Sequence, residues 1–230
     1  RSAYDVALNT ATWLAVVIYF RQDIVDLTKG FFRTLVERRL EGNHNGALAW
    51  MALAATIPVG IAGVLAHDLV AGPLRSLEII GWSSIIWGFV LWAADRRPGS
   101  KDIGRIGWKE TIFVGLAQAV ALIPGTSRSG ITMTAGLFAG LSRTAAARFS
   151  FLLAMIVGAL AGGKEGLDMV QAAEATPWAA VLVGGAVAFV SAYLAIHYFL
   201  KLISRSSMVS FVVYRVVLGV VLLAFAYKLV

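Results

Sequence analysis

The chain has 230 residues, of which 59% are hydrophobic and 14% are charged, and its formal net charge is +7. About a quarter of the residues of a soluble domain carry a charge, so this composition excludes an ordinary soluble protein. The absence of cysteine excludes disulfides and thiolate metal sites. We interpret the chain as an all-α polytopic membrane protein whose basic residues orient loops and do not bind nucleic acid.

Six apolar segments are candidate membrane spans, because a hydrocarbon core of about 30 Å needs about 20 helical residues. In chain order they cover 4–20, 47–66, 76–94, 149–163, 178–200 and 208–227. Between the third and fourth spans, 111–123 and 130–141 are apolar but too short to cross. Because a polar, glycine-containing turn joins them, we predict a re-entrant helix hairpin over 111–141.

The basic residues are concentrated in the loops on one side of these spans. Segments 21–46 and 95–109 carry most of them, and further ones follow the hairpin and precede the last span. Positive-inside counting puts these loops in the cytoplasm and both ends of the chain on the periplasmic or extracellular side. All of these basic loops lie on the cytoplasmic side only if 111–141 enters and leaves the membrane on the same side.

Three spans precede the hairpin and three follow it, which predicts two inverted-topology repeats within a single membrane domain, 1–230. The first repeat would cover about 1–94, a cytoplasmic linker 95–109, and the second repeat 110–230. By symmetry, a second hairpin should precede residue 1. We therefore expect the natural protein to carry an additional N-terminal segment.

The turn of the predicted hairpin reads PGTSRSGIT, residues 124–132. Pro124 blocks continuation of the first helix, and Gly125 allows the chain to turn. Thr126, Ser127 and Ser129 are residue types that cap helix N-termini. A helix that starts here directs free N–H groups and its positive dipole end into the turn, where they favour an anion such as phosphate.

Other side chains could complete this anion site. Arg128 offers a forked, permanently charged donor that fits phosphate oxygens. Ser127, Ser129 and Thr132 could add hydroxyl donors around Gly130, and Gln118 could aim its amide at the same place.

An arginine at membrane depth needs compensation, because its burial there costs about 2.5–3.5 kcal/mol. Two explanations remain open for Arg128: it binds a phosphate group of a ligand, or it pairs with a carboxylate elsewhere in the fold. Arg215, the other intramembrane arginine, lies in the last span, and we interpret it as structural.

The motif resembles the P-G-x-S-R-S-x-x-T signature of the bacterial undecaprenyl-pyrophosphate phosphatase family, which is associated with bacitracin resistance. GLAQAVALIPGTSRSG, LSRTAAARFSFLLAMIVGA and FVVYRVVLGVVLL fit the pattern of that family in order. The opening YDVALNTATWLAVVIYFRQDI resembles the segment that follows the family's first motif. The resemblance covers nearly the whole chain.

The resemblance implies an inner-membrane enzyme that hydrolyses undecaprenyl pyrophosphate to the monophosphate carrier used in cell-wall synthesis. It implies catalytic roles for Ser127, Arg128 and Thr132, with Gly125, Ser129 and Gly130 shaping the turn. It also implies a divalent cation, Mg²⁺ or Ca²⁺. The substrate would be a polyprenyl pyrophosphate lipid, held among membrane lipids, and a homodimer is left open.

The chain departs from the family in one respect: the first motif, an E/Q-x-x-x-E pair followed by a serine–glycine–histidine segment, has no counterpart here. The ligands of the implied metal therefore lie outside this chain. We interpret His44 and His67 as loop residues and His197 as an interfacial residue. A flippase or anion transporter that does not hydrolyse its polyprenyl-phosphate cargo remains an alternative, as does a paralogue that binds the lipid without turnover.

Overall fold

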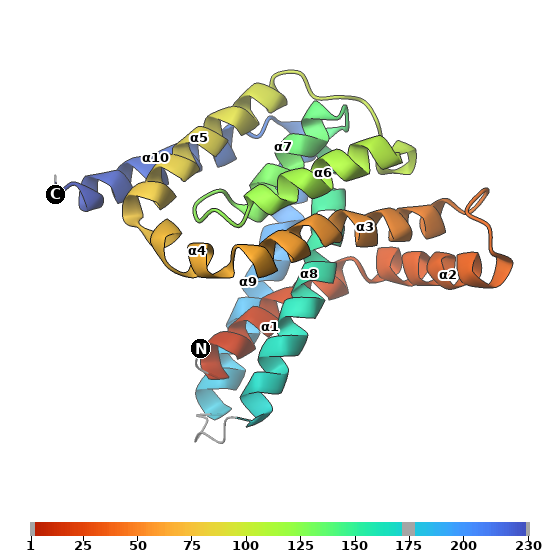
Figure 1. The fold of residues 1–230 in the computed structure, drawn as a ribbon, viewed down its shortest axis with the longest axis horizontal. Coiled ribbons are helices and arrows are strands. Elements are labelled where there is room, and N and C mark those ends of the chain that lie inside the picture. The colour runs from red at the N-terminus through yellow and green to blue at the C-terminus, as the bar shows by residue number, and fades with distance from the viewer. Residues whose placement is uncertain (1–2, 172–177, 229–230) are drawn as a thin grey trace. The chain divides into compact units, whose positions relative to one another are not determined.

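The computed structural model describes residues 3–171 and 178–228. The regular structure in these ranges is helical, joined by turns and short irregular segments, with an isolated bridge between Lys101 and Leu141. Within them, ten α-helices and two short 3-10 helices follow one another along the chain (Figure 1). The elements are α1 Ala3–Tyr19, α2 Arg21–Glu37, α3 His44–Leu65, α4 His67–Ala71, η1 Pro73–Arg75, α5 Leu77–Asp95, η2 Ile103–Arg105, α6 Trp108–Val120, α7 Arg128–Phe138, α8 Arg143–Gln171, α9 Trp178–Arg205 and α10 Val209–Ala226. The all-α prediction is confirmed.

Five helices in the described ranges are long and apolar enough to cross a membrane: His44–Leu65, Leu77–Asp95, Arg143–Leu160, Val181–Arg205 and Val209–Ala226. They correspond to five of the six predicted spans, and the chain is a multi-pass membrane protein. The remaining span, 4–20, falls on α1, which has 17 residues. At 1.5 Å per residue that helix is about 25 Å long, short of a hydrocarbon core of about 30 Å. A sixth crossing therefore stays a prediction.

The chain forms two compact units that interleave along the sequence. One contains residues 1–49 and 151–201, and the other contains 50–150 and 202–230. The boundaries between the units cut through α3, α8 and α9. The predicted repeats divide the chain differently, at about 94 and 110, and they stay a prediction.

In the second unit, α5 and α10 pack as an antiparallel pair with their backbones in close approach. A Cβ added to Gly81 would lie 3.1 Å from the Gly219 carbonyl oxygen, and one added to Gly219 would lie 2.7 Å from the Gly81 carbonyl oxygen. Small residues allow such contact between membrane helices. Further along, Gly88 faces Val212 and Arg215. The pair thus joins the last predicted span of each half of the sequence.

The segment 111–141 does not continue as one helix. It forms α6, of 13 residues, and α7, of 11 residues, which pack against each other across the turn 121–127. At helical rise these are about 20 Å and about 17 Å long, so neither could cross a bilayer alone. The break that we predicted at PGTSRSGIT is confirmed, whereas the depth of the hairpin in a membrane stays a prediction.

Lys101 holds the two ends of the hairpin together. Its backbone N–H donates to the Gly140 carbonyl at 3.1 Å, and its carbonyl accepts from the Ser142 N–H at 2.9 Å, so it binds the chain that leaves α7. Its ammonium group pairs with Glu110 in the first turn of α6. The two ends of the hairpin are therefore neighbours in the structure, whereas their location on one side of a membrane stays a prediction.

The first turn of α6 is stabilised by the same carboxylate. Glu110 Oε2 accepts the Gly107 N–H at 3.0 Å, which caps the helix. The side-chain hydrogen bond from Lys101 is the main cause that lowers the pKa of Glu110 below its ordinary value. A lowered carboxyl pKa means that this cap is intact at neutral pH and weakens as the pH falls into the acid range.

The first unit contains α1, α2 and the parts of α8 and α9 that lie in residues 151–201. Trp13 Nε1 donates to the Met155 carbonyl at 3.0 Å, which fixes α1 against α8. Phe20 stacks on Phe151 at 5.4 Å between ring centroids, and the Tyr19 hydroxyl lies 3.4 Å from His197 Nδ1. The end of α1 is therefore packed among rings of α8 and α9.

Three sequence-based interpretations are corrected here. The segment 21–46, interpreted as a basic loop, contains the 17-residue helix α2. His44 and His67, also placed in loops, each begin a helix. Charge counting located these residues outside the spans, but charge does not distinguish a loop from a charged helix.

Candidate active site

The turn of the hairpin is anchored on α5. Gly125 has φ +88°, and an added Cβ would collide with the backbone of Ile80. The Gly125 carbonyl accepts a hydrogen bond from Ser84 Oγ at 3.2 Å, and the Thr126 and Ser83 hydroxyls lie 3.0 Å apart. Only glycine allows both this positive φ and this close approach to Ile80, so the turn requires glycine at position 125.

Arg215 of α10 holds the same turn from another side. Its Nη2 donates to the Gly125 carbonyl at 2.8 Å, and its Nε donates to the Ser84 carbonyl at 3.4 Å. The residue is only 4% exposed. A Cβ added to Gly130 would lie 2.8 Å from Arg215 Nη1, so this guanidinium lies directly beside the first turn of α7. This placement agrees with the structural role that we expected.

Helix α7 begins at the motif with a cap from Ser127, as the sequence predicted. Ser127 has φ +66°, a backbone conformation that residues other than glycine rarely adopt. Its Oγ accepts the Gly130 N–H at 3.3 Å, and its carbonyl accepts the Ile131 N–H at 2.9 Å. The amide groups of Arg128 and Ser129 have no acceptor among the residues that the structure describes. Two N–H groups and the positive end of the helix dipole are therefore available to an anion.

Arg128 is the first residue of α7 and is half-buried. Within residues 3–171 and 178–228 its guanidinium has no carboxylate or hydrogen-bond partner. The second explanation for Arg128, a carboxylate elsewhere in the fold, thus finds no support in the described part of the chain. The residue offers its donors beside the two available amide groups, where an anion would neutralise it.

Two other predicted site residues direct their side chains into the protein. Thr132 Oγ1 lies 2.7 Å from Ser150 Oγ of α8 and donates to the Arg128 carbonyl at 2.9 Å. Gln118 Nε2 donates to the Ala55 carbonyl of α3 at 3.1 Å, while its Oε1 is buried without a partner among the described residues. In the structure these side chains hydrogen-bond to α8 and α3, and their contact with an anion stays a prediction.

A buried carboxylate fixes the start of α8, directly after the hairpin. Asp95, which ends α5, is 3% exposed and pairs with Arg143 at the start of α8. Its Oδ2 also accepts the Met208 N–H at 2.8 Å, just before α10. One side chain thus fixes the ends of three helices, α5, α8 and α10.

The described residues do not fit the divalent cation that the family resemblance implies. Mg²⁺ and Ca²⁺ prefer several carboxylate and carbonyl oxygens around one point. No three histidine, cysteine, aspartate or glutamate side chains in the described ranges are close enough to hold an ion. Of the acids nearest the hairpin in sequence, Glu110 is paired with Lys101, and Asp102 accepts the Ile103 N–H at 2.8 Å as the cap of η2. Asp95, further away in sequence, is paired with Arg143. No chemical step is therefore derived through a metal here.

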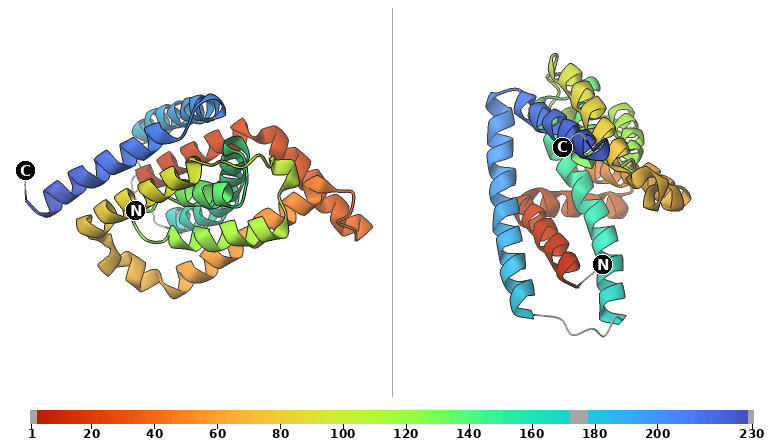
Figure 2. Two further views of the ribbon diagram at one scale, coloured as in Figure 1. Left: turned by 90° about the horizontal axis from the view of Figure 1, so that it is seen from above. Right: turned by 90° about the vertical axis from the view of Figure 1, so that its left-hand side faces the viewer.

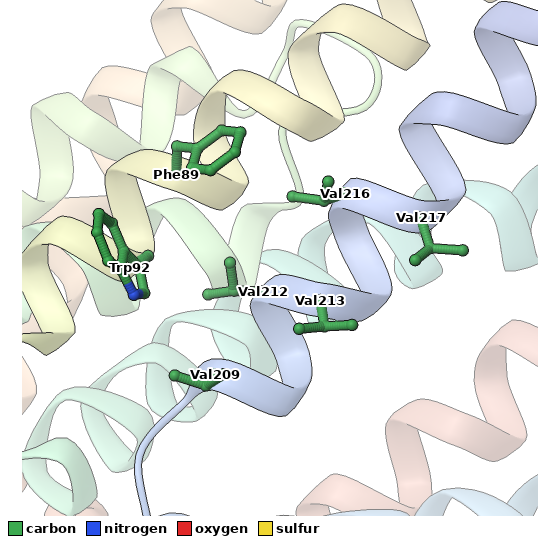
Figure 3. Close-up of a pocket in the computed structure, with 7 residues that line it drawn as sticks. All are labelled: Phe89, Trp92, Val209, Val212, Val213, Val216 and Val217. Atoms are coloured by element: carbon green, nitrogen blue, oxygen red, sulfur yellow. The ribbon is translucent and has the colours of Figure 1, made fainter.

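An apolar groove lies between α5 and α10 (Figure 3). Its cavity volume is about 250 Å³, and its lining residues are Phe89, Trp92, Val209, Val212, Val213, Val216 and Val217. The lining side chains are aromatic or aliphatic and none is charged, so the groove suits a hydrocarbon chain and does not suit a diphosphate.

Sequence reasoning did not single out Ser83, Ser84 or Asp95. A pair of serines inside an apolar span is a usable signal, since polar residues in membrane helices often hydrogen-bond to neighbouring helices. Asp95 gave no such signal, because it is followed by Arg96 and Arg97 and resembles an ordinary loop charge.

Comparisons with known proteins agree with the motif. A sequence model of the family described as bacitracin resistance protein BacA matches residues 1–221. A protein of Stutzerimonas stutzeri named undecaprenyl-diphosphatase 2 is 47% identical over 225 residues, which cover 96% of this chain and 83% of that protein. A Teredinibacter turnerae protein named undecaprenyl-diphosphatase is 48% identical over 221 residues, with the same coverage. The chain therefore belongs to the BacA family of bacitracin resistance proteins.

Proposed function

We propose that the chain is an undecaprenyl-diphosphatase, which hydrolyses undecaprenyl pyrophosphate to undecaprenyl phosphate and inorganic phosphate. The observation that carries the proposal is the N-terminus of α7, where Arg128 and two amide groups have no partner in the described residues. Relatives with this named activity are about half identical to the chain. The reaction recycles the lipid carrier of cell-wall synthesis, which links the enzyme to bacitracin resistance.

The proposed chemistry follows from the charge that develops during hydrolysis. The oxygen of water bonds to the terminal phosphorus, the bond from that phosphorus to the bridging oxygen breaks, and the lipid monophosphate leaves. Negative charge grows on the transferred phosphoryl oxygens, and donors fixed in advance lower the barrier. Arg128 and the amide groups of Arg128 and Ser129 are such donors.

Some residues of the motif contact the substrate, and the others hold those residues in place. Ser127 serves as cap and phosphate ligand, since no general base lies beside it within the described residues. Gly125, Thr126 and Gly130 shape the turn, and Thr132 fixes α7 on α8 through Ser150. Gln118 supports the hairpin through its bond to α3.

A divalent cation remains a proposal that rests on the family resemblance alone. Phosphate release measured with EDTA, and again after addition of Mg²⁺ or Ca²⁺, tests it. If activity in EDTA equals activity in either ion, this proposal is wrong.

The remaining proposals concern location and assembly. The protein belongs in the bacterial plasma membrane, with both ends of this chain on the outer side, because the basic loops favour the cytoplasm. A homodimer stays a proposal as well. Its test is the mass of the detergent-solubilised protein.

Arg128→Ala is the decisive substitution for the proposed function. The purified full-length protein should release phosphate from C55 or C15 pyrophosphate, and Arg128→Ala should lower kcat/KM by about 10²–10³-fold, the usual effect of removing one oxyanion donor. Arg105→Ala, which removes an exposed arginine before α6, is the matched control and should keep activity. Turnover that survives Arg128→Ala would refute the assignment of the site.

The same assay separates the enzyme from a carrier. A flippase or anion transporter would move the lipid across a vesicle membrane without releasing phosphate. Transport without phosphate release by the wild-type protein would replace the hydrolase proposal with the carrier.

A further inference from the structure

Helix α2 carries its apolar and charged residues on opposite sides. At 100° per residue, the apolar side chains fall within about half of the helix circumference. We call this half the apolar face of α2: Ile24, Val25, Leu27, Phe31, Phe32, Leu35 and Val36. The opposite side holds Gln22, Asp23, Asp26, Lys29, Arg33 and Glu37, and Arg21, the first residue of the helix, is the one charged residue on the apolar side. This division distinguishes α2 from the membrane spans, which are apolar all round.

The contact that holds α2 in the first unit is narrow and does not cover the apolar face. Gly30 and Thr34 are the buried residues of the helix. Gly30 lies against Gly46, and its carbonyl accepts from Asn43 Nδ2 at 2.8 Å. On the apolar face, by contrast, Val36 is 84% exposed and Phe32 is 59% exposed. An apolar surface of this kind indicates a partner that the contacts within this unit do not supply.

The direction of α2 within its unit suggests what that partner is. In Figure 1, α9 and the part of α8 in this unit run steeply up the page, while α2 runs nearly horizontally and so crosses their direction. Figure 2 shows the same helices from two further sides. Both α8 and α9 contain candidate membrane spans. A helix that runs across membrane spans lies along the plane of the membrane.

The depth of α2 is set by the joint with α1. Tyr19, one residue before Phe20, contacts His197, and Phe20 contacts Phe151. His197 lies about one turn before Lys201 and about two turns before Arg205, at the basic end of α9. The joint therefore lies near the membrane–water boundary, on the side where positive charges gather.

We propose that α2 is an in-plane anchor whose apolar face enters the boundary between headgroups and acyl chains of an anionic phospholipid surface. The sequence 21–39 contains five basic and three acidic residues, so the charge of the segment suits anionic headgroups. Helices of low overall hydrophobicity, with one apolar and one charged side, bind membranes in this way. This function does not depend on the hydrolase activity proposed above.

Single-cysteine labelling tests the proposal, because the natural sequence contains no cysteine. Val36→Cys and Phe32→Cys place a nitroxide label on the apolar face, and Asp26→Cys places one on the charged side as the matched control. The full-length protein is reconstituted in nanodiscs of phosphatidylglycerol and phosphatidylcholine. Accessibility of each label to oxygen, which partitions into lipid, and to a water-soluble nickel chelate is then measured.

The expected result is a several-fold preference for oxygen at positions 32 and 36, and a preference for the nickel chelate at position 26. Preference for the nickel chelate at positions 32 and 36 would overturn the proposal, because the face would then be in water. Shielding from both reagents would also overturn it, because a protein, such as a second copy of the chain, would cover the face. Phosphate release by the labelled variants shows that they are folded.

Discussion

At the scale of residues, the site depends on two positions with positive φ, of which only Ser127 is strained, and on one buried cation. Gly125 and Ser127 both have positive φ, and Ser127 adopts this conformation although it is not glycine. Such a residue costs about 1–3 kcal/mol and persists only where its surroundings enforce it. Here Arg215, Ser83 and Ser84 enforce it through the turn. The strain is thus balanced by contacts that come from other helices.

Removal of Arg215 should therefore damage the turn. Arg215→Met leaves the Gly125 carbonyl without its charged donor, and a buried charge-assisted hydrogen bond contributes about 1.5–3 kcal/mol. We expect a lower melting temperature in detergent and a lower kcat/KM, with Arg215→Lys intermediate because one ammonium group cannot match the fork. Arg96→Met removes an arginine that only stacks over Trp92, and it should change the melting temperature little. Equal effects of the two substitutions would contradict the role given to Arg215.

At the scale of elements, two side chains position the hairpin and the helices next to it. Lys101 binds the start of α6 and the chain after α7, and Asp95 binds α8 and the start of α10. Contacts of this kind fix where two short helices begin and end, which hydrophobic packing alone leaves free. These contacts help to fix the position of α7, and with it the N-terminus of that helix.

Asp95→Asn tests this arrangement. The asparagine keeps the shape but loses the charge opposite Arg143, and breaking a buried pair from one side costs about 3–5 kcal/mol. We expect a large loss of thermal stability, partly restored in the double variant Asp95→Asn/Arg143→Gln, since that removes the uncompensated cation. Glu37→Gln, which breaks the exposed pair with Arg33, is the control and should cost less than about 1 kcal/mol. Additive effects of the two substitutions at 95 and 143 would show that they are not coupled.

At the scale of the whole molecule, five spans and the distribution of charge determine which loops share a side of the membrane. The hairpin leaves this arrangement unchanged only if its two ends are on the same side. Lys101 brings those ends together in the structure. A direct test therefore needs to probe the chain before and after the hairpin.

Ser100→Cys and Ala139→Cys should react with a membrane-impermeant maleimide from the same side, in inside-out vesicles. Arg75→Cys, an exposed position between α4 and α5, should instead react in intact spheroplasts, because one span separates it from Ser100. If Ala139→Cys instead reacts in intact spheroplasts, as Arg75→Cys does, then 111–141 crosses the membrane once and the re-entrant hairpin is wrong.

The sequence by itself determined the membrane class, five of the spans, the break at Pro124–Gly125 and a helix start within the motif, with Ser127 as one of three candidate caps. These features are local: hydropathy is a property of a single segment, and proline, glycine and a capping serine act on neighbouring backbone. It also identified the family, through the motif and further stretches along nearly the whole chain. It did not reveal helix α2 within 21–46, because the charged residues there were interpreted as loop signals.

Only the tertiary structure decided which polar side chains face the site and which support it. Arg215 meets Gly125 across 90 residues of sequence, Gln118 is occupied by α3, and Thr132 is occupied by α8. Each of these residue types could equally well bind an anion, and the sequence could not rank them. Their roles follow from which helices pack together, and packing depends on contacts between distant segments that no local pattern encodes.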